Sequence, residues 1–355
     1  MYSHSPIAKR GLLLFILLGV LAFQSHAEKK PYQVVSVAFY NFENLFDTLD
    51  DPKNWGDNDF LPDGPYRYTP EVYKQKLYNL STVLAQLGTD ITPDGPVIIG
   101  AAEIENARVL QDLTEQPLIK HRDYKYVHFD SRDTRGIDVA LLYNPRYFKV
   151  LSAGVFSVNA CEAFEKTSKT RDILHVTGVL ATDTIHVLVN HWPSRRGGET
   201  ATAPSRALAA GVCRRTIDSL LGQDSFSKII VMGDLNDDPT NHSIATVLSA
   251  RSEKQKVRPQ DLYNPFFSFY KKGYGTLGYN DSWSLFDQIM ISASLLNNNS
   301  AHWRYYRAEV FNKSFLKYKF GQYKGYPLRS FEGHNWMNGY SDHFPSLIYL
   351  IRPVS

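Results

Sequence analysis

A carboxylate and a carboxamide lie two positions apart in this sequence, at Asp234 and Asn236. They follow the apolar run 229–232, whose β-branched residues and closing Gly233 predict a buried strand. Side chains two positions apart on extended chain point the same way, so both can face one target. A carboxylate binds a hard cation or orients a water, and an amide both donates and accepts hydrogen bonds. Taken alone, the pair is more typical of a turn, so the interpretation as a site depends on further polar groups.

Polar side chains also follow the first two predicted strands, 34–40 and 97–101. Asn41 lies where the first apolar pattern ends, and Glu103 and Glu105 follow the second. Alternation along a strand would put both glutamates on one face. Two carboxylates beside an apolar strand need solvent, a partner or a metal ion, although Glu105 can instead begin the next helix.

A third group of polar residues follows the predicted strand 185–190. His191, Arg195 and Arg196 lie there on a glycine-bearing loop. Imidazole and guanidinium groups donate hydrogen bonds to several oxygens of one anion, so we expect this loop to bind a phosphate of the substrate. Asp138 is embedded in another apolar strand, where it must find hydrogen-bond donors for either a structural or a catalytic purpose.

Two acids and a histidine belong to the last two predicted strands, 286–291 and 346–350. Asp287 lies in the first, and Asp342 and His343 lie just before the second. Adjacent side chains on extended chain point to opposite faces. We therefore expect Asp342 to face a metal ion and His343 to face a phosphate oxygen, with the imidazole oriented by Asp287. For His343, the alternative is an ordinary polar residue of the core.

Apolar runs typical of strands recur along the chain and place these groups at strand ends. They cover 34–40, 97–101, 137–143, 185–190, 229–232, 286–291 and 346–350. Amphipathic patterns predict helices over 70–87 and 204–221. Strands mixed with a few helices predict an α/β or α+β fold built around sheets. We expect the acidic segment 47–68 to be a loop and the aromatic segment 299–340 to be a surface excursion.

The N-terminal segment has the pattern of a secretory signal peptide. Lys9 and Arg10 precede the apolar run 11–23, and small residues lead to Ala27. The run is shorter than the roughly 20 residues that a membrane-spanning helix needs. We therefore expect cleavage near Ala27, no stable membrane anchor, and a secreted or periplasmic protein. The absence of a linker rich in Pro, Gly or Ser predicts that residues 28–355 form a single domain.

Removal of residues 1–27 takes away two positive charges, so the formal net charge falls from +3 to +1. A nearly neutral protein is not expected to bind nucleic acid nonspecifically and strongly, although local basic clusters can still steer a phosphate. The composition therefore leaves the substrate open. Cys161 and Cys213 would lie in an oxidising compartment, where they either form a disulfide or remain free thiols.

The strand-end groups, taken in order, resemble those of the endonuclease/exonuclease/phosphatase superfamily. The resemblance covers about residues 34–350. Any one group is weak evidence alone, but the ordered set that ends in Ser341-Asp342-His343 is highly specific. It implies an α/β (α+β) four-layer sandwich, with two mixed β-sheets packed face to face, helices outside, and the active site at one end. It also implies hydrolysis of phosphoester bonds with Mg²⁺, or alternatively Mn²⁺ or Ca²⁺, as the cofactor.

The resemblance assigns the metal to residues of the first half and the end of the chain. Glu103 would be the principal ligand, with Asp342 and Asn41 close to the metal. The residue before this glutamate is Ala102, where the family usually has glutamine, so an outer contact of the metal site differs here.

The resemblance also implies catalytic roles. Asp234 would orient or deprotonate the attacking water, and Asn236 would contact the phosphate. His343, paired with Asp287, and His191 would stabilise the phosphoryl oxygens. Each such donor contributes on the order of a hundredfold to the rate of comparable reactions.

These observations predict an exported hydrolase, most simply an endonuclease or related phosphodiesterase whose substrate is nucleic acid. A phosphatase that acts on sugar, nucleotide or lipid phosphates is the alternative within the same chemistry. A binding protein without catalytic activity is the alternative outside it, and the complete set of acids and histidines argues against it. No protein partner is predicted, and endonucleolytic and exonucleolytic cleavage are not distinguished by the sequence.

Overall fold

The computed structural model describes residues 1–2, 31–158, 169–297 and 301–354. Contacts divide the chain into two units, Met1–Pro31 and Tyr32–Ser355. Cys161 and nearly all of the predicted signal peptide lie outside the described residues. Among the residues that the structure describes, no helix has the length and apolar character needed to cross a membrane.

The second unit contains a six-stranded mixed sheet. Its order is β14 (Arg304–Val310), β17 (Ser346–Pro353), β1 (Tyr32–Leu45), β2 (Ile98–Ile104), β4 (Asp138–Tyr143) and β3 (Lys125–His128). β1 and β2 are parallel, whereas the other neighbours are antiparallel. The carboxyl ends of β1 and β2 therefore point the same way, which brings the residues that follow both strands to one edge of the sheet.

A seven-stranded mixed sheet supplies the second layer of strands. Its order is β5 (Phe148–Phe156), β6 (Ile173–Leu180), β7 (Asp183–His191), β8 (Lys228–Asp234), β13 (Asp287–Ser292), β10 (Leu262–Tyr263) and β9 (Ala250–Arg251). β7 and β8 are parallel and end in register at His191 and Asp234. Antiparallel β13 begins at Asp287, which lies opposite Asp234. Three polar residues predicted from the sequence thus meet at one end of this sheet.

In the described part of the chain, four α-helices connect and cover the strands. They are α1 (Pro70–Gln86), α2 (Ala107–Thr114), α3 (Glu199–Gln223) and α4 (Phe267–Lys271). α1 begins as the sequence predicts, with the Thr69 hydroxyl accepting from Val72 N and proline in the first turn. α3 begins five residues before Pro204, the predicted start, because a proline so near the N-terminus removes only one helical hydrogen bond.

Shorter elements complete the unit. Short 3₁₀ helices cover Asn58–Phe60, Lys120–Arg122, Lys254–Lys256, Ala293–Leu296 and Ser314–Leu316, and a π-helical turn covers Ser243–Val247. Two small hairpins pair β11 (Leu277–Tyr279) with β12 (Ser282–Ser284) and β15 (Phe331–Glu332) with β16 (Asn335–Trp336).

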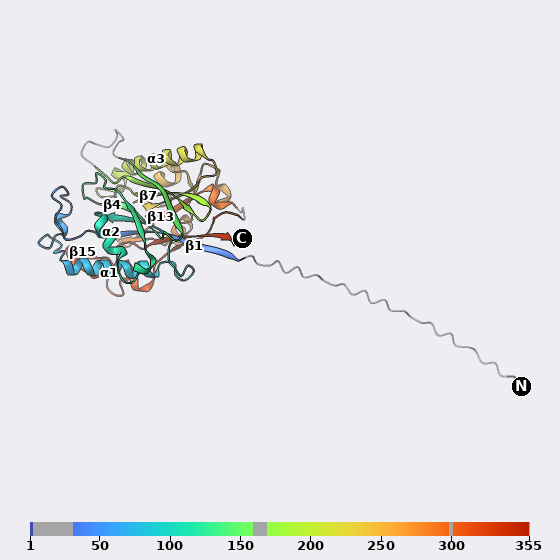
Figure 1. Cartoon of the computed structure of the whole chain (residues 1–355), viewed down its shortest axis with the longest axis horizontal. Coiled ribbons are helices and arrows are strands. Elements are labelled where there is room, and N and C mark those ends of the chain that lie inside the picture. Colours follow the sequence, from blue (N-terminus) through green and yellow to red (C-terminus); the bar gives the residue numbers. More distant parts are fainter. Residues whose placement is uncertain (3–30, 159–168, 298–300, 355) are drawn as a thin grey trace. The chain divides into compact units, whose positions relative to one another are not determined.

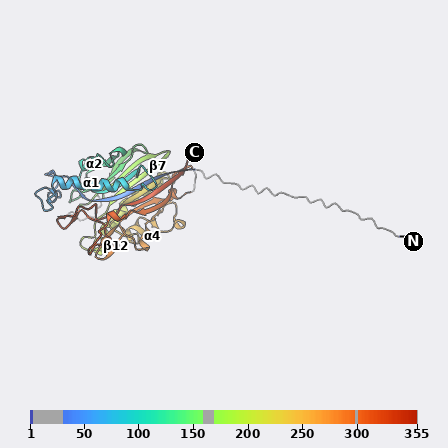
Figure 2. The ribbon, with the colours of Figure 1, turned by 90° about the horizontal axis from the view of Figure 1, so that it is seen from below.

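The alternation of apolar residues along β8 explains the layers. Ile230 and Met232 belong to the large core that joins both sheets, whereas Ile229 and Val231 belong to a second core shared with α3. A strand apolar on both faces must be covered on both sides. Within the unit Tyr32–Ser355, α1 and α3 accordingly lie on opposite sides of the strands (Figure 1). In the view turned by 90°, α1 and α2 lie together, away from α4 and β12 (Figure 2).

One sequence expectation about this unit is wrong in part. The segment 299–340 is not wholly a surface excursion, because Arg304–Val310 forms β14 and pairs with β17 at the edge of the six-stranded sheet. An edge strand needs only one apolar face, and here the half-exposed residues obscure the alternation in the sequence.

Candidate active site

Asp234, Asp287 and His343 form the centre of the candidate site. His343 Nδ1 lies 2.6 Å from Asp287 Oδ2, and its Nε2 lies 3.8 Å from Asp234 Oδ2. All three side chains are buried, and one ligand atom of each lies within 4.8 Å of those of the others. The sequence predicted that Asp287 orients His343, and the structure shows this contact.

The two carboxylates determine the charge of the imidazole. Burial lowers the pKa of His343, but Asp287 and Asp234 outweigh it and raise that pKa well above its usual value. Burial also raises the pKa of Asp234, although His343 opposes this shift. His343 is therefore an imidazolium at neutral pH, and such a cation donates a strong hydrogen bond to an anionic oxygen.

Asn41 fixes the Asp234 carboxylate from the neighbouring sheet. Its Nδ2 donates to Asp234 Oδ2 at 3.1 Å, and its Oδ1 accepts from Glu43 N at 2.8 Å. The structure thus places the residue predicted near the metal directly on the carboxylate predicted to orient water.

Asn236 reaches the site by a route different from the one expected. β8 ends at Asp234, and Asn236 has a φ of 49°, so the two side chains do not share a strand face. Asn236 N instead donates to Asp234 Oδ1 at 3.1 Å, and its Nδ2 donates to Trp192 O at 3.0 Å. The turn interpretation is confirmed, and the turn itself holds the carboxylate that the site interpretation requires.

His191 closes the other side of Asp234. Its Nε2 lies 3.5 Å from Asp234 Oδ2 and 3.9 Å from Glu103 Oε1. Burial and the nearby Arg171 guanidinium keep the pKa of His191 well below its usual value. His191 is therefore a neutral imidazole, in contrast to His343. Its buried Nδ1 has no hydrogen-bond partner among the described residues.

Glu103 lies at an irregularity in β2. Its φ of 63° coincides with a register shift, so the predicted alternation with Glu105 breaks at this point. Glu103 Oε2 accepts from Asn44 N at 2.8 Å, and Oε1 pairs with Arg135 Nη2 at 3.0 Å. Glu105 binds Asp47 N instead, so the expectation that both glutamates share a face is wrong.

The electrostatics of Glu103 favour the ionised form. Burial opposes ionisation, but the charge and hydrogen bond of the Arg135 guanidinium outweigh it and hold the pKa of Glu103 well below its usual value. A carboxylate that stays charged at every physiological pH is well suited to be a ligand of a cation.

Asp342 is held from a different segment. Its Oδ2 accepts from Arg329 Nη2 at 3.0 Å, and its Oδ1 lies 3.9 Å from His343 Nε2. Glu43 supports the same arginine, since its Oε1 lies 3.7 Å from Arg329 Nε, and its Oε2 accepts from Ser330 N at 2.6 Å. Lys76 of α1, which is fully buried, donates to Ser330 Oγ at 2.6 Å.

The structure does not bring Arg195 and Arg196 to the phosphate position. The Arg195 guanidinium pairs with Asp237, Asp238 and Glu199 and lies over the Phe286 ring, so it braces the loop behind Asn236. Arg196 is exposed.

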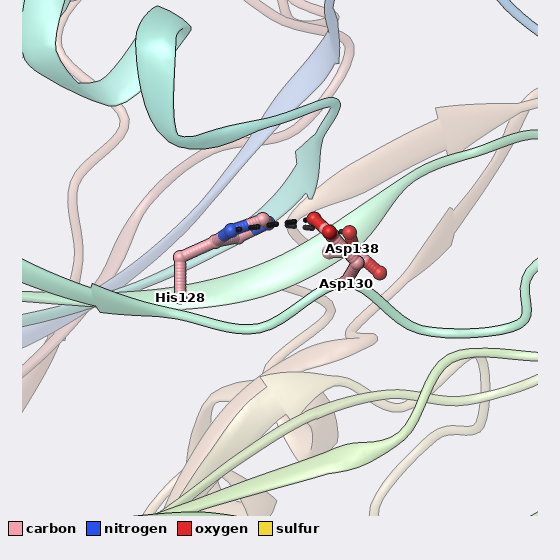
Figure 3. Close-up of side chains that lie close together, drawn as sticks. All are labelled: His128, Asp130 and Asp138. Carbon is pink, nitrogen blue, oxygen red and sulfur yellow. Dashed lines mark hydrogen bonds and ion pairs between the residues drawn. The ribbon is translucent and has the colours of Figure 1, made fainter. Parts of the chain in front are cut away.

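Asp138 lies in a separate cluster on β3 and β4. Its Oδ2 lies 3.2 Å from His128 Nε2 (Figure 3). Its Oδ1 accepts from Ser131 N at 2.9 Å. Asp130, the third member, has an exposed side chain 3.9 Å from His128 Nδ1. Asp138 thereby finds the donors that a buried acid requires, and it fixes the start of the loop that carries Arg135.

Sequence reasoning missed the cationic groups that touch the site. They are Arg135 on Glu103, Arg329 on Asp342, and Arg171, whose Nε and Nη2 donate to the carbonyls of His191 and Trp192. All three precede or follow strands on loops, where the sequence has no periodic signal. Arg135 lies three residues before the embedded Asp138, and that proximity was the one available indication.

The donor atoms fit a hard divalent cation. Glu103 and Asp342 offer carboxylate oxygens, the ligands that Mg²⁺ prefers. In the structure these two carboxylates pair with the guanidinium groups of Arg135 and Arg329. The site offers fewer nitrogen ligands than oxygen ligands to a metal ion, because His343 Nδ1 already pairs with Asp287.

Comparisons with known proteins agree with this geometry. The sequence model described as the Endonuclease/Exonuclease/phosphatase family matches residues 36–352. None of the curated proteins compared with the sequence matches it.

Solved structures share the fold at low sequence identity. An endonuclease/exonuclease/phosphatase family protein from Bacteroides thetaiotaomicron is 17% identical with a TM-score of 0.55, covering 92% of this chain and 100% of that chain. Mannosyl-6-phosphatase from the same species is 17% identical with a TM-score of 0.51, covering 89% and 99%. D. rerio TDP2 with a single-strand DNA product is 11% identical with a TM-score of 0.53, covering 89% and 98%. These similarities confirm the predicted four-layer fold.

Proposed function

Because the chain belongs to the Endonuclease/Exonuclease/phosphatase family, and is thus a hydrolase of phosphoester bonds, we propose that it is an exported, Mg²⁺-dependent phosphodiesterase that acts on nucleic acid. The observation that carries this proposal is the buried cluster of Asp234, Asp287 and His343, in which one imidazolium lies between two carboxylates.

The side chains divide the reaction between them. Asp234, fixed by Asn41 and by Asn236 N, orients the attacking water and accepts its proton. His343 donates to the phosphoryl oxygens, whose negative charge grows as the water approaches. The bond from phosphorus to the leaving oxygen breaks on the side opposite the water, and solvent protonates that oxygen.

Hydrolases of this family depend on a divalent metal, and the described acidic and histidine groups can bind one. Glu103 and Asp342 would hold Mg²⁺, with Asn41 on the neighbouring carboxylate. When bound, the ion would withdraw charge from the phosphoryl group and the leaving oxygen.

A phosphatase is the second candidate. It is supported by the fold shared with a mannosyl-6-phosphatase and by the nearly neutral charge of residues 28–355. The catalytic cluster is the same for both candidates, so the difference between them lies in the substrate that reaches it.

Substrate profiling of purified residues 28–355 tests the proposal. The panel would contain single-stranded and double-stranded DNA, RNA, nucleotides, sugar phosphates and phospholipids, each with Mg²⁺ and with EDTA. We expect nucleic acid to be hydrolysed with Mg²⁺ and spared with EDTA. Hydrolysis of monoesters alone would favour the phosphatase, and hydrolysis unaffected by EDTA would exclude the assigned metal role.

Export is tested separately. The pattern Lys9-Arg10, apolar run and Ala27 supports cleavage before Glu28. N-terminal sequencing of protein recovered from the periplasm or medium should begin at residue 28. Full-length protein retained in the cytoplasm would contradict the localisation without affecting the proposed activity.

A further inference from the structure

A cavity of about 300 Å³ lies beside the catalytic cluster, with Asp342 in its wall. Four of the nine other lining residues are tyrosines. The rings come from Tyr279, which ends β11, and from Tyr318, Tyr323 and Tyr326 in the segment between the last 3₁₀ helix and β15.

The backbone of the segment 317–327 closes on itself, which fixes the three tyrosines that it carries. Tyr318 N donates to Tyr326 O at 2.9 Å, and Gly325 N donates to Tyr318 O at 2.9 Å. Successive rings contact one another, with centroids 5.8 Å apart for Tyr318 and Tyr323 and 6.2 Å apart for Tyr323 and Tyr326. The wall is therefore a preformed aromatic surface.

A glycine on β11 brings this wall against the sheet. A Cβ at Gly278 would lie 2.7 Å from the Tyr326 ring, so only glycine allows the ring to pack there. Trp283 of β12 supports the same ring from the side, with centroids 5.2 Å apart. Two segments far apart in the sequence thus build one cavity.

Arg329 and Asp342 connect the cavity to the chemistry. Both line the cavity and bind each other at 3.0 Å, and Asp342 is the residue directly before His343. A substrate whose phosphate lies at His343 therefore has its neighbouring group at the mouth of the cavity.

The chemistry of the wall favours a planar ring over a sugar. The hydroxyls of Tyr318 and Tyr326 are buried and have no hydrogen-bond partner among the described residues, so these two residues offer the cavity their rings. The charged groups Arg329 and Asp342 already bind each other. A hexose would leave several hydroxyls unpaired here, whereas a planar ring can stack on tyrosine.

We propose that this cavity binds the nucleobase of the nucleotide next to the scissile phosphate, so that the enzyme selects nucleobase-bearing phosphoesters. This inference rests on the proposed function, because it names the substrate group that the same site accepts.

The test compares substrates that differ only in the ring. Dinucleotides carry a base or a tetrahydrofuran abasic residue on each side of the phosphodiester in turn, and nucleoside 5′-phosphate is compared with ribose 5-phosphate and a hexose 6-phosphate. We expect loss of the base on one side to lower kcat/KM of the wild-type enzyme about tenfold or more, since base stacking is typically worth that factor.

The preference is the ratio of kcat/KM with the base to kcat/KM without it. In the variants Tyr279→Ala and Tyr323→Ala this ratio should fall towards one. Both tyrosines are exposed, at 71% and 36%, so neither substitution should impair folding. Tyr279→Phe keeps the ring and should keep the preference. Tyr306→Ala, which removes an exposed ring on β14 outside the cavity, is the matched control.

Equal kcat/KM with and without the base, or a preference that survives in both alanine variants, would overturn the inference and leave the phosphoester hydrolase intact. Preference for the hexose phosphate would overturn it as well. If no phosphoester is hydrolysed, the proposed function fails instead. The cavity is then tested by calorimetric titration of a nucleoside into the wild-type protein and into Tyr279→Ala. Weaker binding by the variant supports the inference, and equal or absent binding contradicts it.

Discussion

Asp234 is the residue on which the site converges. Its two oxygens lie near Asn41, His191, His343 and the Asn236 backbone, all within 3.8 Å. A buried carboxylate is costly unless it is paired and hydrogen-bonded. The partners that satisfy this need also fix the orientation of the carboxylate, so the contacts that stabilise it are those that the proposed water-orienting role requires.

The Asp287–His343 pair yields a first prediction. Asp287→Asn removes the main charge that keeps His343 protonated, so we expect kcat to fall about a hundredfold while KM changes little. Steady-state kinetics of the single variants and of Asp287→Asn with His343→Ala measure this. Because the two residues act as a unit, the double variant should lose no more than His343→Ala alone. Additive losses would show that they act independently.

The contacts of individual residues could be predicted from the sequence where the prediction did not depend on the local backbone conformation. The Asp287–His343 contact followed from composition and order, whereas two same-face expectations were wrong. Both failed because the backbone leaves extended geometry, at Glu103 with a φ of 63° and at Asn236 with a φ of 49°. Residues other than glycine rarely adopt these angles, and no pattern of side chains reveals them.

At the level of elements, the close approach of β7 and β8 sets the position of Asp234. A Cβ at Gly233 would lie 2.3 Å from Asn190 O, a backbone atom that no side-chain rotation can move away. The glycine before Asp234 is therefore required by the strand pairing.

Gly233→Ala tests this requirement. We expect the free energy of unfolding to fall by about 1–3 kcal/mol, as is usual for overpacked cores, and activity to fall with it. Urea denaturation and kinetics measure the two effects. Gly154→Ala on β5, where a new Cβ would meet nothing within 4 Å, is the control and should change stability by less than about 0.5 kcal/mol. Equal effects of the two substitutions would contradict the steric argument.

The elements could be predicted best where they are buried. β8 is apolar on both faces and α1 has an apolar stripe, because both pack against the core, and both elements were predicted. β14 was missed because it is an edge strand with few buried positions, and the cavity wall at 317–327 has no regular element at all. Such segments are placed by tertiary contacts that no local pattern encodes.

At the scale of the whole molecule, the unit Tyr32–Ser355 joins two mixed sheets through one large core, and the site lies where strand ends from both sheets meet. Asn41 and Glu103 come from the six-stranded sheet, whereas Asp234 and Asp287 come from the seven-stranded sheet. The catalytic geometry therefore depends on sheet packing and should be lost in any partly unfolded state.

A pair of histidines, one on β6 and one on β7, is expected to make the free energy of unfolding depend on pH. His175 Nε2 lies 3.2 Å from His186 Nδ1, and burial followed by the neighbouring His186 lowers the pKa of His175 to about 4. Burial also lowers the pKa of His186, although Asp224 opposes this shift. Both histidines line a second cavity, to which Arg215 of α3 also contributes.

The pKa of His175 is about 6.5 in the unfolded chain and about 4 in the folded protein. At pH values between these two, the unfolded chain binds more protons than the folded protein. Stability should therefore fall as pH falls through this window and be unaffected by this group above pH 7. His175→Gln removes the titration, so the loss of unfolding free energy between pH 7.5 and pH 5 should shrink by about 1 kcal/mol, given the partial exposure. Urea denaturation at both pH values measures this. An unchanged loss would exclude His175 as a contributor.

The central claim is that the buried cluster around Asp234 performs metal-dependent hydrolysis of phosphoesters. The most direct measurement is kcat/KM with Mg²⁺ on the best nucleic-acid substrate for wild type, Asp234→Asn and the surface control Asp218→Asn on α3, with folding of all three checked by circular dichroism. We predict a loss of at least about a hundredfold for Asp234→Asn and none for Asp218→Asn, because only the first residue orients the attacking water. Wild-type activity in a folded Asp234→Asn enzyme would contradict the account.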